Sequence, residues 1–159
     1  MKNDLSFIAF EPHDGQFKGA VPIDTVWANY PDLEYRLKKA EMLYKKYIYK
    51  LRSMINGFKA IKAKKGCIPA REVWKLGDAI FKLVLDLQYL SFQIDGLYDH
   101  LMRDLDAKRM WLEKVIIFRR YLPEFQCIPA SLSWGRCRDN PRHSAQLLAN
   151  EHMERTKGG

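Results

Sequence analysis

The chain has 159 residues, 47% of them hydrophobic and 13% aromatic, which is enough apolar surface to close the core of one domain. These values exclude an intrinsically disordered chain. Without a run of eighteen apolar residues or a cationic leader, we expect no membrane contact and a cytoplasmic location. Three cysteines, an odd number, indicate reduced thiols rather than a disulfide framework.

The formal net charge of +8 comes from one segment of the chain. Residues 32–65 hold eleven Lys and Arg against three Asp and Glu, a net of +8, and the other 125 residues hold sixteen of each. Concentrated cations release condensed counterions when they bind phosphates. The distribution therefore favours a polyanionic partner, and nucleic acid (DNA or RNA) is the one we expect.

Residues 1–31 show no helical period and contain three prolines and scattered large apolar side chains. We interpret them as an extended N-terminal arm. An aromatic tail of this kind packs either on its own helices, which we favour, or on a partner.

The segment from Asp32 to Lys65 predicts one long helix that ends at Gly66. Apolar residues recur at steps of four and three, which is a heptad pattern. This seam consists of Leu33, Leu37, Ala40, Tyr44, Tyr47, Leu51, Met54, Phe58 and Ile61. A helix of roughly 50 Å is longer than one edge of a small domain needs, so we expect it to reach a partner protein or a second copy of the chain.

Beside the seam lies a row of cations at every seventh residue, which we name the basic rail: Lys38, Lys45, Arg52 and Lys59. Arg36, Lys39, Lys46, Lys50 and Lys62 flank it. Few acids intersperse these cations after Glu41, so we favour an anionic ligand over a merely solvated face. Tyrosines of the helix could stack on bases, but Tyr44 and Tyr47 belong to the seam and are better read as core.

Three further helices and a short last one are expected. They cover the apolar stretch after Pro69, the stretch from Leu97 to Leu105, the stretch from Met110 to the residue before Pro123, and residues 144–155. The second and third of these form a candidate helix-turn-helix pair, whose Arg109, Arg119 and Arg120 make a second basic patch. Any antiparallel helix pair gives the same outline.

The predicted fold is thus all-α, a helical bundle with one long heptad-patterned helix and an extended N-terminal arm. The predicted domain boundaries are 1–31 for the arm, 32–125 for the helical core, and 126–159 for an irregular C-terminal segment with a short helix.

The sequence CIPA occurs twice, at 67–70 and 127–130, and in both places a tryptophan follows four residues after the alanine. The residues beyond each copy differ, which argues against a duplication. A zinc site would draw on Cys67, Cys127, Cys137 and His143, but their spacing matches no common zinc motif. We interpret both copies as helix entries of the same design, with the cysteines as small buried residues.

No catalytic motif is present, and we expect neither an enzyme nor a bound metal or cofactor. The densest group of titratable residues is the 97–105 stretch, where His100 and Asp104 share a face. We interpret this face as exposed and salt-bridged.

Residues 73–123 resemble the N-terminal helical domain of the YhcG family, in which that domain precedes a PD-(D/E)xK-type nuclease domain. The matching stretches are VWKLGDAI (73–80), LYDHLMRDL (97–105) and KRMWLEKVIIFRRYLP (108–123). Trp111 stands where the family has Asn, and Asp99 interrupts its Tyr-Gly pair. The resemblance implies a helical module that assists a nucleic-acid-processing system, without nuclease activity of its own.

We therefore expect a non-enzymatic nucleic-acid-binding accessory protein of a DNA- or RNA-processing, defence or mobile-element complex, which binds the phosphate backbone through the basic helix. The alternative is a helical protein–protein scaffold or small subunit of a larger assembly, in which the seam and the arm mediate assembly and the rail meets an acidic protein.

Overall fold

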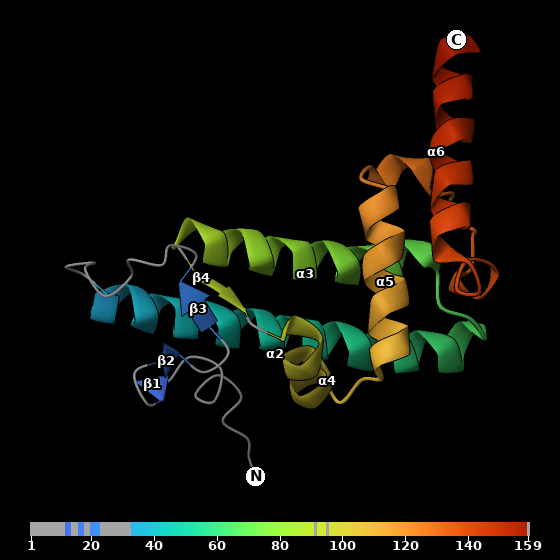
Figure 1. Cartoon of the computed structure of the whole chain (residues 1–159). Helices are drawn as coiled ribbons and strands as arrows, with labels where there is room; N and C mark the ends of the chain where they lie inside the picture. Colours follow the sequence, from blue (N-terminus) through green and yellow to red (C-terminus); the bar gives the residue numbers. More distant parts are fainter. Residues whose placement is uncertain are drawn as a thin grey trace. The chain divides into compact units, whose positions relative to one another are not determined.

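The computed structural model of the chain describes residues 12–13, 16–17, 20–22, 33–90, 92–94 and 96–158. Its fold is all-α, as predicted (Figure 1). The chain forms two compact units. Unit 1 comprises Met1–Arg52 and Ile80–Arg109, and unit 2 comprises Ser53–Ala79 and Met110–Gly159.

The longest helix is α2 (Leu33–Lys65), whose bounds confirm the predicted long helix. It ends because Gly66 adopts a left-handed backbone with φ of 82°, and the Gly66 N–H donates to the carbonyl of Lys62 at 2.8 Å. Glycine adopts this conformation without the steric penalty that a Cβ brings. The glycine stop was therefore readable from the sequence.

The other α-helices among the described residues are α3 (Ala70–Tyr89), α4 (Leu97–Leu105), α5 (Arg109–Tyr121) and α6 (Pro141–Gly158). Two short 3₁₀ helices, η2 (Phe125–Cys127) and η3 (Trp134–Arg136), precede α6. The tight turn after α4 is made by Asp106, with φ of 52°, and by the Ala107 N–H, which donates to the carbonyl of Met102. The last helix is longer at both ends than the predicted 144–155 helix.

In the part of the chain that the structure describes, four short strands accompany the helices: β1 (Pro12–His13), β2 (Gln16–Phe17), β3 (Ala20–Pro22) and β4 (Phe92–Ile94). β1 pairs with β2, and β3 pairs antiparallel with β4, which Figure 1 shows side by side. The backbone of residues 20–22 thus pairs with the chain's own residues 92–94. The aromatic side chains of the predicted arm, and most of its backbone, lie outside the described residues.

In unit 1, the core is formed by one side of α2, the second half of α3, α4 and Phe92. Tyr44, Ile48 and Leu51 of α2 are fully buried, together with Leu83, Leu87 and Leu101. Polar contacts join the same elements: the Tyr47 hydroxyl donates to Asp86 at 2.6 Å.

In unit 2, aromatic side chains dominate the core. Phe118 of α5 and Trp134 of η3 meet edge to face with ring centroids 5.3 Å apart. The Trp74 indole donates to the carbonyl of Leu122 at 2.6 Å, and its ring contacts Phe125. α3 and α5 approach closely at Gly77, where a Cβ would lie 2.8 Å from the Cβ of Arg119. No helix among the described residues is long and apolar enough to cross a membrane.

The two CIPA segments do not share one local design, contrary to the prediction. Pro69 precedes the first turn of α3, whereas Pro129 begins a turn closed by the Leu132 N–H, and residues 130–140 form no α-helix. Instead, the chain after the second copy pairs with the first: Ala70 donates to Leu132, and Trp134 donates to Ile68. Cys67 is exposed rather than buried, while Cys127 is buried as predicted; Cys137 is buried as well.

Candidate nucleic-acid interface

The four members of the basic rail on α2 differ in their surroundings. Lys38 and Lys59 are exposed. Lys45 lies 3.9 Å from Glu41, and the Arg52 Nε donates to the backbone carbonyl of Asp104 at 2.7 Å. Two of the four rail cations therefore contact groups of unit 1, and the spacing of seven residues in the sequence does not predict these contacts.

A second row of residues on α2 is more open to solvent. Tyr35, Met42 and Tyr49 follow at intervals of seven residues and are 58%, 70% and 64% exposed. The exposed lysines Lys39 and Lys46 stand three or four residues from them, and the exposed Lys50 follows Lys46 by four residues, so all three lie on the same side of the helix. We name these six residues the Tyr–Lys face; all of them belong to unit 1.

The Tyr–Lys face is exposed because a different side of α2 packs on the core of unit 1. Ala40, Tyr44, Ile48 and Leu51 are fully buried, and their steps of four, four and three residues mark one stripe of the helix. The interpretation as core is thus confirmed for Tyr44, whereas Tyr47 is half-buried and its hydroxyl donates to Asp86. Tyr35 and Tyr49 are the two tyrosines of α2 left on the open side.

The Tyr–Lys face is strongly cationic. Between residues 35 and 50 the sequence contains six Lys and Arg and one acid, Glu41. The Lys39 ammonium lies 4.9 Å from the centre of the Tyr35 ring, a cation–π contact that holds a charge beside an exposed aromatic ring. Within the part of the chain that the structure describes, Lys46 and Lys50 form no ion pair.

The other predicted binding residues lie elsewhere. Arg36 donates to the carbonyl of Leu90 at 3.4 Å. In unit 1, Arg109 stands 3.6 Å from Asp99 and over the Tyr98 ring. In unit 2, Arg119 is bound to Asp78 at 2.9 Å and covers Trp74, whereas Arg120 is exposed.

Lys62 lines a small pocket of unit 2 with a volume of about 140 Å³. Arg138 and the exposed thiol of Cys67 also line it, and Trp134 forms part of its wall. Two cations at one small pocket suit an anion. Arg138 could not be predicted from the sequence, because it shares this pocket with Lys62 only through the pairing of residues 68–70 with residues 132–134.

The face of α4 that we interpreted as exposed is partly buried. Asp104 is 1% exposed, and Arg103 donates to its two carboxylate oxygens at 2.7 and 3.0 Å. The Tyr44 hydroxyl donates to the same carboxylate. The prediction of an exposed face was wrong for Asp104, because α4 turns this residue toward α2 within unit 1.

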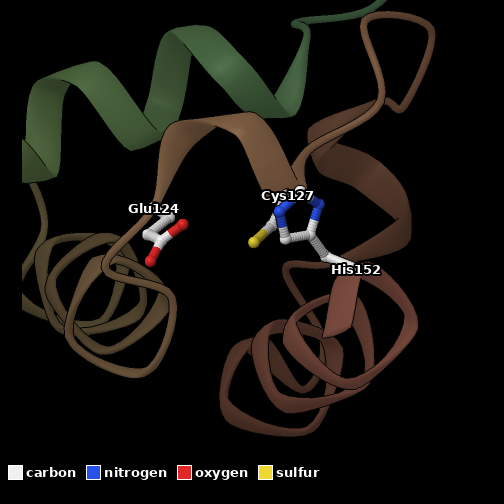
Figure 2. A group of neighbouring side chains, drawn as sticks. All are labelled: Glu124, Cys127 and His152. Atoms are coloured by element: carbon white, nitrogen blue, oxygen red, sulfur yellow. The ribbon is translucent and has the colours of Figure 1, made fainter. Parts of the chain in front are cut away.

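A group with metal-ligating atoms occurs in unit 2, although the sequence predicted no metal. Glu124, Cys127 and His152 bring a carboxylate oxygen, a sulfur and a ring nitrogen within 4.8 Å of one another (Figure 2). Burial raises the pKa of the Cys127 thiol and the Glu124 charge adds to this effect, while Arg155 opposes it. The zinc reading that we considered from the sequence included Cys127 but neither of its two neighbours here.

Comparison of the chain with protein-family models, with curated proteins and with solved structures finds no match. Similarity to the YhcG helical domain therefore stays a prediction from the sequence, and the site must be interpreted from its own chemistry.

Proposed function

We propose that the protein is a non-enzymatic nucleic-acid-binding protein and that the Tyr–Lys face of α2 is its binding surface. The observation that carries the proposal is that two exposed tyrosine rings and three exposed lysines lie along one side of the helix. Lysines neutralise phosphates, and aromatic rings stack on unpaired bases. Together they suit a strand whose bases are accessible.

The proposal changes which residues of the basic helix should bind. Lys39, Lys46 and Lys50, with Lys38 at the edge of the face, replace the regular rail as the main phosphate contacts. Arg52 and Arg119 are left out, because each would have to give up a bond within its own unit to reach a phosphate. Arg120, Lys59 and Lys62 remain candidates for secondary contacts.

The protein–protein scaffold remains the alternative, but its proposed interface is weakened by burial. Four seam residues, Ala40, Tyr44, Leu51 and Phe58, are buried within the chain itself. A partner helix would need them to be open. An acidic protein that binds the Tyr–Lys face is the form of the alternative that stays consistent with this burial.

A role as accessory subunit of a DNA- or RNA-processing, defence or mobile-element complex is a more specific proposal, and it rests on the resemblance of residues 73–123 to the YhcG helical domain. The candidate helix-turn-helix is part of this more specific proposal. α4 lies in unit 1, and α5 lies in unit 2 except for its first residue. Neither feature is needed for binding through α2.

The test is fluorescence anisotropy with labelled single-stranded DNA, duplex DNA and single-stranded RNA. A face variant carries Lys39→Gln, Lys46→Gln and Lys50→Gln, and a control variant carries Lys108→Gln, Arg136→Gln and Lys157→Gln, three exposed cations outside α2. Both lose three charges. We expect the face variant to bind on the order of tenfold or more weakly and the control to bind nearly as the wild type does.

Tyrosine variants separate stacking from simple charge attraction. Tyr35→Ala with Tyr49→Ala should weaken single-stranded binding by about 1–3 kcal/mol per stacked base, while Tyr35→Phe with Tyr49→Phe keeps both rings and should bind normally. Equal losses in the face and control variants would contradict the proposed surface. Absence of binding to all three probes at low salt would contradict the function and favour an acidic protein partner.

A further inference from the structure

Glu124, Cys127 and His152 of unit 2 form a cluster that the proposed function does not use. One ligating atom of each residue lies within 4.8 Å of the others. Figure 2 shows the Glu124 carboxylate and the Cys127 sulfur turned toward each other, with the imidazole of His152 beside the sulfur. Oxygen, sulfur and nitrogen donors thus converge from two separate segments of the chain.

The local fold places the first two donors. Glu124 precedes η2 as its N-cap, and the Cys127 N–H donates to the Glu124 carbonyl at 3.1 Å. In a 3₁₀ turn, residues i and i+3 stand nearly above one another. The turn after Pro123 therefore directs both side chains to the same side of the segment.

The packing of α6 places the third donor. Ala145 and Leu148 are buried, and His152 follows them at the helical steps of three and four residues. All three lie on one side of α6. The contacts that bury Ala145 and Leu148 also set the rotation of the helix, and this rotation directs His152 toward η2.

The donor set selects the kind of metal. Thiolate and imidazole ligands favour Zn²⁺ over Ca²⁺ and Mg²⁺, which bind oxygen. Tetrahedral Zn²⁺ with these ligands holds its donor atoms about 3.4–3.6 Å apart. Each separation must therefore shorten by at most about 1.4 Å, and the exposed Glu124 side chain and the half-buried His152 can rotate to do this.

We propose that Glu124, Cys127 and His152 bind one Zn²⁺ ion, with a water molecule in the fourth position. Thiolate and carboxylate together carry two negative charges, which match the ion. The Arg155 side chain, one turn after His152, is the nearby cation that works against the site. The bound ion links α6 to the 3₁₀ segment that follows α5, so it fastens the C-terminal helix within unit 2.

The test uses the full-length protein, freed of metal with a chelator and titrated with Co²⁺ as a spectroscopic substitute for Zn²⁺. We expect one equivalent to produce a thiolate-to-cobalt charge-transfer band and the intense visible bands of four-coordinate cobalt. Zn²⁺ should then displace the cobalt, and Zn²⁺ alone should raise the Tm of the wild type.

Variants identify the ligands. Glu124→Gln and His152→Gln change side chains that are not fully buried, so the fold should persist. Each should weaken Zn²⁺ binding by more than about 100-fold, because loss of even an outer-shell partner of a metal ligand can weaken metal affinity by about 100-fold. Cys127→Ala should abolish the charge-transfer band, whereas the matched controls Cys67→Ala and Cys137→Ala should retain it. Cobalt binding without the band, or full affinity in Glu124→Gln or His152→Gln, would overturn the assignment.

Discussion

Asp104 of α4 keeps a charged side chain inside unit 1 because neighbouring groups donate to it. Arg103 donates twice to its carboxylate, the Tyr44 hydroxyl donates to the same group, and Arg52 donates to the Asp104 backbone carbonyl. A buried carboxylate without such donors would lose several kcal/mol of solvation. The need to satisfy one carboxylate thus restricts how α4 can pack on α2 within this unit.

Removing one of these donors should have a measurable cost. Tyr44→Phe deletes the hydroxyl but keeps the buried ring, so we expect the free energy of unfolding at pH 7 to fall by about 1–2 kcal/mol. Tyr49→Phe is the matched control, since that tyrosine is 64% exposed and should change stability by less than about 0.5 kcal/mol. Urea unfolding followed by circular dichroism measures both. Equal stability of the two variants would show that the Tyr44 bond contributes nothing.

The same hydroxyl should make stability sensitive to alkali. Burial, and secondly the bond to Asp104, raise the pKa of Tyr44 above its ordinary value. In the unfolded chain this tyrosine ionises near pH 10, whereas the folded chain retains its proton. The stabilisation from Tyr44 is therefore complete below about pH 10 and is lost progressively above it. Unfolding of wild type and Tyr44→Phe from pH 8 to 11 should show their difference in stability shrinking; a constant difference would contradict the linkage.

At the level of elements, the sequence predicted the helices better than their exposed sides. Heptad spacing and Gly66 were enough to define α2, because both are local signals. Which cations stay open depends on what packs against the helix. Ile48, outside the predicted seam, is fully buried, while Tyr47 is half-buried and bonded to Asp86. The buried stripe of α2 therefore runs through Ile48 rather than Tyr47, and the solvent-exposed side carries Lys39, Lys46 and Lys50 instead of the whole predicted rail.

The Glu–Cys–His cluster was beyond the reach of the sequence for a related reason. Glu124 and Cys127 are close in the chain, but His152 joins them only through the packing of α6. No local spacing encodes that contact. The second CIPA copy was misread in the same way, because the bonds at Leu132 and Trp134 are made with residues more than sixty positions away.

Two glycines test how tightly the helices of unit 2 are packed. At Gly77 of α3, an added Cβ would meet the Cβ of Arg119 at 2.8 Å and the carbonyl of Val115 at 3.0 Å. We expect Gly77→Ala to lower the free energy of unfolding by about 1–3 kcal/mol, since α5 must shift. At Gly57 of α2 nothing lies within 4 Å, so Gly57→Ala should instead raise it by about 0.5–1 kcal/mol. Thermal and urea unfolding measure the stability of both variants. A stabilised Gly77→Ala variant would show that α3 and α5 do not pack closely at this position.

At the level of the whole molecule, charge is distributed unevenly. The net charge of the chain equals the net charge of residues 32–65, and elsewhere cations and acids balance. A polyanion attracted by the long-range field is therefore attracted chiefly to α2. In a protein that is evenly basic, by contrast, any three cations would contribute alike to the attraction.

That distinction sets the expected salt dependence of binding. For duplex DNA the logarithm of the association constant falls with the logarithm of salt concentration by about 0.9 for each phosphate neutralised, and for a single strand by about 0.7. If Lys39, Lys46 and Lys50 each contact a phosphate, the variant with all three changed to Gln should have a slope shallower by about 2–3. The Lys108, Arg136 and Lys157 variant should keep the wild-type slope, because its lost charges lie outside α2. Anisotropy titrations across a range of salt concentrations give both slopes, and an equal reduction in the two variants would mean that overall charge, not this helix, drives binding.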